Sequence, residues 1–348
     1  MTTSEFATLF EEAVSPAGLS GSAARRAFDA ILAGSWSVPQ VAGFISALRA
    51  KGESHEVIAS AAQAMRQAML PVPHDFPKVL DTCGTGGDGS GTVNLSTGAA
   101  IIVAATGIPV AKHGNRAVSS KAGSADVLAA LGIPLDLSAM QAARVLNQAK
   151  ISFLLAPTHH PAMRHAMPAR KELGVRTIFN CLGPLCNPAR ATHQVIGVFA
   201  DSLRPIIANT LKDLGSQAAW VVRGDDGLDE VSPYSATRVT ELRQGTVREL
   251  QVTPEDFGIP RSPAGAAQGG DAVENARIIE AVLANQAHPA RDAFLLNAAA
   301  ALVVAEAIPY ADATARARDA LQSGAALATL EAWRTACRSA AAASPQPG

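Results

Sequence analysis

Apolar residues in the first seventy positions recur with the spacing of α-helices. In the stretch SAARRAFDAILAG, the side chains of Phe28, Ile31 and Leu32 fall on one helical face. The stretches SVPQVAGFISALRAKG and SHEVIASAAQAMRQAM repeat this spacing, with polar residues on the opposite face. The pattern therefore predicts three amphipathic helices that pack their apolar faces together.

A proline-rich stretch, LPVPHDFP, ends this helical pattern, and after it short apolar runs alternate with helical segments. The runs that read as strands are KVLDTC, IPVAKHG, ISFLLAP, HQVIGVFA and QAAWVVRG. Between them lie segments with helical spacing, such as LSTGAAIIVAAT. Strands that alternate with helices are typical of a parallel sheet with both faces covered.

Two segments interrupt the alternation. Residues 162–185 are rich in helical pattern, and TRVTELRQGTVRELQV alternates by two about Gln244-Gly245, which is typical of an antiparallel hairpin. We therefore predict an α/β fold with a small all-helical N-terminal domain and a larger α/β domain whose central sheet is mainly parallel. The predicted boundaries are residues 1–72, joined by helices from about 162–185, and residues 76–345.

Composition narrows the class of protein. Of 348 residues, 48% are hydrophobic and 17% are charged, so the chain can bury a large core and is not disordered. The net charge of −1 gives no basic surface for nucleic acid. The N-terminus lacks the basic start of a signal peptide, and the longest apolar runs are too short to cross a bilayer. We expect a cytoplasmic protein without a membrane segment, whose four cysteines stay reduced.

The stretch DTCGTGGDGSGTVNLST, residues 81–97, follows the first predicted strand and contains five glycines. A Walker A loop would need Lys-Ser or Lys-Thr after the last glycine, whereas Thr92 and Val93 follow Gly91. A dinucleotide-binding loop would need an acidic residue at the end of the next strand. That strand ends in Lys112 and His113, and a cation there suits a phosphate better than a ribose diol.

Two successive strands are thus followed by turns rich in hydrogen-bond donors. The glycines of the first turn let backbone N–H groups approach an anion, and the next helix begins beside them. The second turn, KHGNRAVSSKAGSAD, supplies Lys112, Asn115, Arg116, Ser119 and Ser120, and Ser124 is predicted to cap the following helix. Two such turns on neighbouring strands predict a ligand with two separate phosphate groups.

A third turn is acidic. The predicted strand QAAWVVRG leads into DDGLDE, which contains the adjacent carboxylates Asp229 and Glu230. Magnesium is commonly held by one or two carboxylates together with the phosphates of a ligand. Beside two anion-binding turns, this acidic pair indicates a magnesium site.

Taken together, the motifs GTGGDG…NLST, KHGNRAVSS…GSADVLAALG, RKELGVRTIFNCLGPLCNPA and DGLDEVS resemble the anthranilate phosphoribosyltransferase family. The resemblance covers almost the whole chain. It implies a helical domain on an α/β domain related to pyrimidine nucleoside phosphorylases, and a homodimer. It also implies transfer of the phosphoribosyl group of 5-phosphoribosyl 1-diphosphate (PRPP) to the amine of anthranilate, with release of pyrophosphate.

The resemblance also implies the site residues. The PRPP site would comprise Gly84, Gly87, Asp88, Thr92, Asn94, Leu95, Ser96, Thr97, Lys112, His113, Gly114, Asn115, Arg116, Ala117, Val118, Ser119, Ser120 and Ser124. Anthranilate would meet Gly84, Asn115 and Arg170, and Mg²⁺ would bind Ser96, Asp229 and Glu230. The catalytic residues would be Lys112, Asp88 and Arg170. The chain departs from the family at Arg223, where a histidine is more common, and at Lys121.

Two other functions remain open at this stage. A nucleoside phosphorylase would use one glycine-rich anion turn and a nucleobase pocket, and the second donor-rich turn argues against it. A non-catalytic relative that binds nucleic acid would need a basic stripe, which the composition does not provide.

Overall fold

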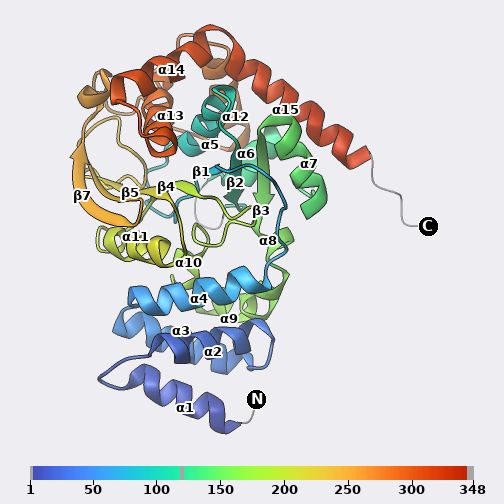
Figure 1. Ribbon diagram of the computed structural model, residues 1–348, viewed down its shortest axis with the longest axis vertical. Coiled ribbons are helices and arrows are strands. Elements are labelled where there is room, and N and C mark those ends of the chain that lie inside the picture. The colour runs from blue at the N-terminus through green and yellow to red at the C-terminus, as the bar shows by residue number, and fades with distance from the viewer. Residues whose placement is uncertain (1–2, 118–120, 343–348) are drawn as a thin grey trace.

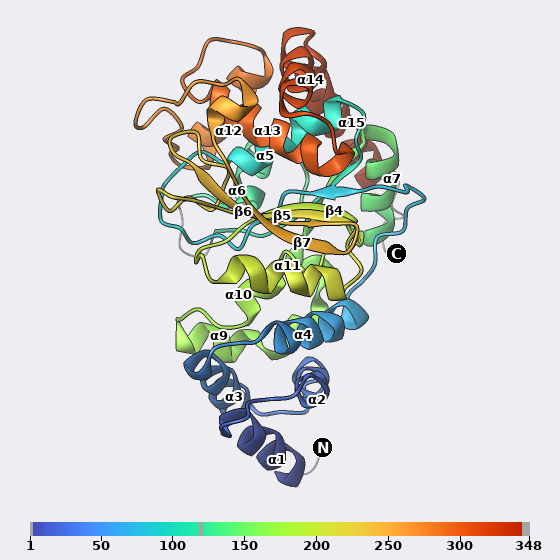
Figure 2. The ribbon, with the colours of Figure 1, turned by 60° about the vertical axis from the view of Figure 1, so that its left-hand side comes forward.

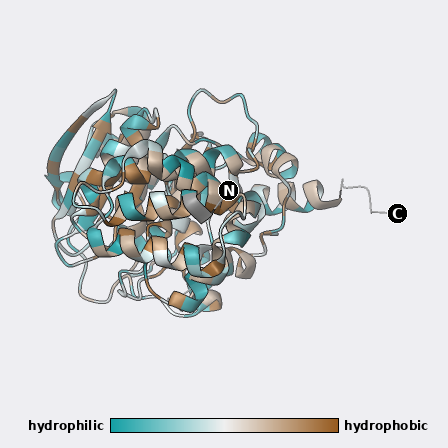
Figure 3. Cartoon of the chain, turned by 90° about the horizontal axis from the view of Figure 1, so that it is seen from below, coloured by the Kyte–Doolittle hydropathy of each residue, from teal (hydrophilic) through white to brown (hydrophobic). Residues whose placement is uncertain are grey.

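The computed structural model describes residues 3–117 and 121–342. The chain begins with four helices, one more than the pattern predicted: α1 (Thr3–Val14), α2 (Gly21–Leu32), α3 (Val38–Lys51) and α4 (His55–Ala68). They form the lower end of the molecule in Figure 1, with the N-terminus at the bottom. In the view from below, single helices carry both hydrophobic and hydrophilic residues, as amphipathic packing requires (Figure 3).

The rest of the chain builds one seven-stranded sheet of order β3-β2-β1-β4-β5-β6-β7. The strands are β1 (Leu80–Asp81), β2 (Val110–Gly114), β3 (Ile151–Leu155), β4 (His193–Gly197), β5 (Ala218–Gly224), β6 (Thr237–Arg243) and β7 (Thr246–Val252). The pairs from β3 to β5 are parallel, and β6 and β7 add antiparallel strands at one edge. This confirms the predicted mainly parallel sheet and the predicted hairpin. Gln244 and Gly245 both have positive φ, as a tight hairpin turn requires.

Helices cover both faces of the sheet (Figures 1 and 2). The helices above it in both views are α5 (Leu95–Ala105), α12 (Ala272–Leu283), α13 (Arg291–Glu306), α14 (Tyr310–Gln322) and α15 (Ala325–Ala342). Also present are α6 (Ser124–Ala130), α7 (Ala139–Ala149) and the short helix η2 (Pro254–Phe257). Below the sheet, α11 (Leu203–Asp213) separates it from the N-terminal helices.

The predicted helix-rich segment runs from the lower side of the sheet into the N-terminal helices. It contains α8 (Ala156–His159), η1 (Pro161–His165), α9 (Met167–Leu173) and α10 (Phe179–Leu182), and α9 lies below α4 in Figure 1. Its buried residues Ala169, Ile178 and Phe179 share one hydrophobic core with α2, α3 and α4. The same core continues to Ile196 and Val221 on the lower face of the sheet. Because this packing is continuous, the boundary between residues 72 and 76 stays a prediction.

Among the described residues, no single helix is long and apolar enough to cross a membrane. The pair α13 and α14 would suffice by length and composition, but it is bent by 120°. Nearly all of α13 is buried in the upper core of the α/β domain.

The order of the strands predicts where a ligand-binding crevice should lie. From β1 the chain proceeds outward to β2 and β3, and it then returns to place β4 on the other side of β1. In open parallel sheets, ligands bind outside the carboxyl ends of the strands at such a reversal. The glycine-rich turn leaves β1 at this edge, and the acidic turn follows β5 at the same edge.

Candidate active site at the carboxyl ends of the parallel strands

The glycine-rich turn after β1 lies across the end of β4. The backbone N–H of Thr85 donates to the carbonyl oxygen of Gly197 at 2.8 Å, and the Thr85 hydroxyl accepts from the N–H of Phe199 at 3.1 Å. A side chain at position 197 would place its Cβ 1.5 Å from the carbonyl oxygen of Asp229. Glycine at this position therefore allows the turns after β1, β4 and β5 to meet.

Lys112 on β2 is a buried cation beside the glycine-rich turn. Its side chain is only 2% exposed. The Nζ donates to the Thr82 carbonyl oxygen at 3.1 Å and to the Ser96 hydroxyl at 3.2 Å, so it joins β1 to the first turn of α5. Successive side chains on a strand point to opposite faces, and His113 accordingly contacts Gly183 below the sheet.

The second turn, after β2, is held by an acidic residue that the sequence analysis missed. The carboxylate of Asp126 accepts from the N–H groups of Ala117 at 2.9 Å and Gly123 at 3.0 Å, and it pairs with the exposed Arg116 at 3.2 Å. The prediction that Ser124 caps the helix is wrong. Gly123 is the N-cap and Ser124 the first residue of α6, because the carboxylate of Asp126 at the third helical position binds the N–H of Gly123 and so fixes the start of the helix there.

The other residues of this turn are placed as follows. Gly114 ends β2, and the exposed Asn115 uses its Oδ1 to accept from the N–H of Arg116 at 2.8 Å. The candidates Val118, Ser119 and Ser120 lie outside the described residues.

The acidic pair after β5 faces the glycine-rich turn. Glu230 Oε1 accepts from the N–H of Ser96 at 3.3 Å, and the N–H of Asp229 donates to a carboxylate oxygen of Asp88 at 3.3 Å. Burial and the neighbouring Asp88 raise the pKa of Asp229 to about 7. Burial and the charge of Asp229 also raise the pKa of Glu230. Three carboxylates thus lie close together, and the nearby cations that oppose these shifts are Lys112 for Glu230 and Arg223 for Asp229.

This donor set fits a hard cation. Carboxylate and hydroxyl oxygens are the protein ligands that Mg²⁺ prefers, and the carboxylate of Glu230, the residue after Asp229, lies close to Ser96. In the described ranges, no group of three or more His, Cys, Asp or Glu side chains could hold a metal ion. A site completed by the phosphates of a ligand is the arrangement that Mg²⁺ commonly uses.

Comparison with known proteins supports the resemblance found in the sequence, and the matches cover both domains. Residues 76–327 match the glycosyl transferase family, a/b domain, and residues 8–69 match the helical bundle domain of that family. An anthranilate phosphoribosyltransferase of Rhodopseudomonas palustris (strain TIE-1) is 48% identical over 328 residues, which are 94% of this chain and 97% of the relative. The chain belongs to the anthranilate phosphoribosyltransferase family.

Solved structures of this family have the same fold. The anthranilate phosphoribosyltransferase of Thermus thermophilus superposes with a TM-score of 0.89 at 40% identity, over 96% of this chain and 99% of that one. The enzyme of Saccharomyces cerevisiae in complex with PRPP and Mg also has a TM-score of 0.89, at 29% identity, over 97% of this chain and 99% of that one.

Most of the PRPP residues implied by resemblance to the anthranilate phosphoribosyltransferase family lie around the crevice, at the ends of β1 and β2. Leu95 and Thr97 are fully buried at the start of α5, while Asn94 is half-buried as its N-cap. Thr92 forms an isolated bridge with Gln268, whose side chain also donates to the Gly91 carbonyl oxygen at 2.8 Å. Gln268 was missed because nothing in the sequence indicates that a segment nearly two hundred residues later closes over the turn.

Arg170 lies elsewhere, on α9 in the layer of helices below the sheet. Its guanidinium contacts the Met167 sulfur at 3.7 Å and lies 5.4 Å from the Phe179 ring centre. Burial lowers its pKa. Within the described part of the chain, no hydrogen bond joins Arg170 to the glycine-rich turn.

Arg176, six residues later, does reach that turn and was missed. Its Nη2 donates to the carbonyl oxygen of Gly87, and its guanidinium lies 4.3 Å from the centre of the Phe199 ring. Its own carbonyl oxygen accepts from the guanidinium of Arg49 on α3. Arg176 thereby connects the helical layer to the candidate PRPP site.

Arg223, which stands where the family more often has a histidine, also lies beside the site. Its Nη1 donates to the Val198 carbonyl oxygen at 2.9 Å, and its charge acts to lower the pKa of the nearby Asp229. Arg223 therefore opposes part of the rise in the pKa of Asp229 that burial and Asp88 cause.

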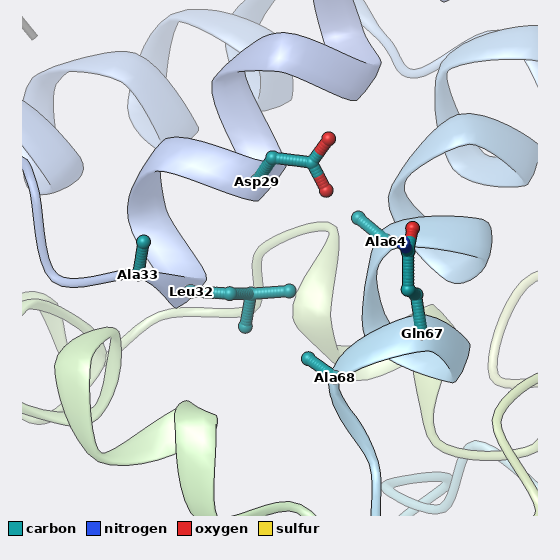
Figure 4. Close-up of a pocket in the computed structure, with 6 residues that line it drawn as sticks. All are labelled: Asp29, Leu32, Ala33, Ala64, Gln67 and Ala68. Atoms are coloured by element: carbon teal, nitrogen blue, oxygen red, sulfur yellow. The ribbon is translucent and has the colours of Figure 1, made fainter.

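A pocket of about 210 Å³ lies away from this crevice, between α2 and α4 (Figure 4). It is lined by Asp29, Leu32, Ala33, Ala64, Gln67 and Ala68. Its one charged lining residue is an acid, so the pocket does not suit a phosphate ligand. The site at the strand ends has the donors and cations that this pocket lacks.

Three histidines are buried close together: His113 on β2, and His159 and His160 at the end of α8. The rings of His113 and His160 lie 5.1 Å apart, and His113 Nδ1 is 2.9 Å from the carbonyl oxygen of Gly183. Burial and the neighbouring histidines lower the pKa of His113 to about 3 and that of His160 to about 4, and burial also lowers the pKa of His159. The folded protein therefore holds these rings in the neutral form.

These histidines are expected to make the fold sensitive to acid. Below about pH 6.5 these histidines bind protons in the unfolded chain but stay neutral in the folded chain. The free energy of unfolding therefore falls as the pH drops toward about 4. Each ring contributes a slope of up to about 1.4 kcal/mol per pH unit in this window. Thermal unfolding of His160→Gln should depend less on pH than that of the wild type. The exposed His55→Gln is the control, and an unchanged slope in His160→Gln would contradict the assignment.

Proposed function

We propose that this protein is an anthranilate phosphoribosyltransferase that uses Mg²⁺. It would transfer the 5-phosphoribosyl group of PRPP to the amine of anthranilate, giving N-(5-phosphoribosyl)anthranilate and pyrophosphate, the second step from chorismate to tryptophan. The observation that carries this proposal is the meeting of two donor-rich turns, the buried Lys112 and the acidic pair Asp229 and Glu230 at one crevice. A substrate with two separate phosphate groups requires this combination.

The reaction needs charge stabilisation and positioning more than acid–base catalysis. The C1–O bond to pyrophosphate breaks with its electron pair on the leaving oxygen, and the anthranilate nitrogen forms a bond to C1 and releases a proton. Lys112 and the backbone N–H groups of the glycine-rich turn would stabilise the leaving group. The turns would hold the ribose phosphate in place, which lowers the entropic part of the barrier.

Mg²⁺ would be held by Ser96, Asp229 and Glu230, and when bound it would neutralise charge on the diphosphate. Asp88 lies beside Asp229 and adds to the negative potential that favours a cation. Lys112 already donates to the Ser96 hydroxyl, so the lysine and the candidate metal ligands form one connected group.

Arg170 would bind the anthranilate carboxylate, because its guanidinium can form two parallel hydrogen bonds with a carboxylate. Among the described residues, the partners of its guanidinium are a sulfur and an aromatic ring, neither of which is a strong hydrogen-bond acceptor. Its partial burial would strengthen a charged pair.

Replacement of Arg170 by alanine should raise the anthranilate KM about 10- to 100-fold, since a hydrogen bond to a charged group contributes roughly 1.5–3 kcal/mol. The KM of PRPP should change by less than about twofold. Steady-state kinetics with each substrate varied would measure both, with Arg164→Ala on the exposed face of η1 as the control. An equal rise in both KM values would remove Arg170 from the anthranilate site.

The function itself is tested by mixing the purified protein with PRPP, Mg²⁺ and anthranilate and following the loss of anthranilate fluorescence. A loss that requires protein, PRPP and metal together supports the proposal. No loss with anthranilate, together with phosphorolysis of thymidine or uridine, would instead support a nucleoside phosphorylase. We also retain the homodimer and the cytoplasmic location as predictions from the family, and analytical ultracentrifugation of the purified chain measures the former.

A further inference from the structure

Asn94 is an N-cap residue that does not cap its helix. It precedes α5 with its side chain half-buried, and its Oδ1 makes no hydrogen bond to the free N–H groups of the first turn. An asparagine at an N-cap ordinarily accepts from one of those groups. The Asn94 Oδ1 instead accepts a hydrogen bond from a residue outside α5.

The partner is Asn275 on α12, a residue 181 positions later in the chain. Its Nδ2 donates to the Asn94 Oδ1 at 2.9 Å, and its side chain is only 2% exposed. Helices α5 and α12 lie side by side above the sheet (Figures 1 and 2). The pair joins the start of α5 to the first turns of α12.

The direction of this hydrogen bond follows from its neighbours. The backbone N–H of Gly270 lies 2.7 Å from the Asn275 Oδ1. A backbone N–H can only donate, so the Asn275 oxygen must face Gly270 and its NH₂ must face Asn94. Asn94 must then present its oxygen to Asn275 and direct its own NH₂ the other way.

That NH₂ lies between the two anion-binding turns. Asn94 stands at the end of the glycine-rich turn, and its Nδ2 lies 3.5 Å from the carbonyl oxygen of Ala122 in the second turn. This bond is long, so the amide keeps donor capacity for a ligand placed between the turns. A donor suits a phosphate oxygen or ribose hydroxyl there, whereas a carbonyl oxygen would repel a phosphate.

The segment before α12 is hydrogen-bonded to the end of the glycine-rich turn. The N–H of Gly269 donates to the Gly91 carbonyl oxygen at 2.9 Å, and the N–H of Val93 donates to the Ala267 carbonyl oxygen at 2.9 Å. A Cβ at position 269 would lie 2.6 Å from the Val93 nitrogen and 2.7 Å from the Asn275 Oδ1. The close approach that brings Asn275 to Asn94 thus depends on glycine at position 269.

We propose that Asn275 is a positioning residue for PRPP, which fixes the Asn94 amide with its NH₂ toward the phosphoribosyl diphosphate. The proposal rests on the proposed function. Asn275 itself would touch no substrate and would act through Asn94 alone.

The test is Asn275→Asp, which keeps the size of the side chain and the bond from Gly270 but removes the donor to Asn94. Asn94 would rotate to donate to the new carboxylate and would present its oxygen to the diphosphate. We expect the PRPP KM and the Kd of PRPP in the presence of Mg²⁺ to rise about tenfold or more, because the lost bond involves a charged ligand. The anthranilate KM should stay within about twofold.

Two further variants separate positioning from a loss of structure. Asn147→Asp makes the same replacement on the exposed face of α7, where the side chain bonds only within its own helix, and should leave PRPP binding unchanged. In an Asn94→Ala background, Asn275→Asp should add little to the PRPP KM, since its effect passes through Asn94. Should Asn275→Asp fold poorly, Asn275→Ala, which frees the Asn94 amide, should still raise the PRPP KM about threefold.

The outcomes distinguish this proposal from the function on which it rests. A wild-type protein that binds PRPP and consumes anthranilate, with an unchanged PRPP Kd in folded Asn275→Asp, would overturn the positioning role alone. An equal rise in both KM values, or full additivity with Asn94→Ala, would also overturn it. A wild-type protein that binds no PRPP would overturn both.

Discussion

Lys112→Met is expected to lower kcat/KM about 10²- to 10³-fold, because it would remove the donor that we propose stabilises the charge developing on pyrophosphate. The lysine is buried among the Thr82 carbonyl oxygen and the hydroxyls of Thr82 and Ser96. Its charge also opposes the rise in the pKa of Asp81 and of Glu230. Methionine keeps the volume of the side chain and removes both the donor and the charge.

Steady-state kinetics and PRPP titration measure this effect, with Lys212→Met on the exposed face of α11 as the control. Loss of the Lys112 charge leaves the buried carboxyl groups of Asp81 and Glu230 less compensated, so the variant should be less stable than the wild type, and circular dichroism checks that it is folded. A folded Lys112→Met with nearly wild-type kcat/KM would show that the backbone N–H groups suffice and that Lys112 has a structural role.

Asp229→Ala should weaken the use of Mg²⁺ and PRPP together, with kcat/KM reduced about 10²-fold or more at a fixed Mg²⁺ concentration. Burial and Asp88 raise the pKa of Asp229, and burial together with the charges of Asp229 and Asp88 raises the pKa of the adjacent Glu230. A bound cation would remove that repulsion, so the loss of one carboxylate weakens the site. The activity should recover in part as the Mg²⁺ concentration increases.

The stability of the metal-free protein provides a readout that does not depend on activity. The folded-state pKa of Asp229 is about 7, whereas an unfolded aspartate has a pKa near about 3.9. Between these values the folded chain holds a proton that the unfolded chain releases, so this group reduces stability as the pH rises from about 4 to about 7. Asp229→Asn should therefore be at least as stable as the wild type at pH 8 without Mg²⁺.

The same variant should show a smaller thermal shift on addition of Mg²⁺ with PRPP than the wild type does. Asp312→Asn, on the exposed face of α14, is the matched control for both measurements. Unchanged dependence on Mg²⁺ in the Asp229 variants would remove this residue from the metal site.

The local pattern of apolar and turn residues was sufficient to predict the strands and the types of side chain in the turns that follow them. The strand KVLDTC, the strand IPVAKHG and the hairpin at Gln244-Gly245 all form where alternation and turn residues predicted them. The prediction for Ser124 was wrong because a serine before a helical pattern is a common cap, and only the fold shows that Asp126 binds the N–H groups of Ala117 and Gly123 and that the helix begins at Ser124. The helix α1 was missed because its mixture of acidic and apolar residues was not recognised as a helical pattern.

The sequence by itself determined the α/β class, the two donor-rich turns and the acidic pair, because glycine content, charge and spacing are local properties of the chain. The tertiary structure alone decided which distant residues complete the site. Asn275 reaches Asn94 through the packing of α12 on α5, and Arg176 reaches Gly87 from the helical layer. Such contacts depend on how whole elements pack, and no periodicity within either segment encodes them.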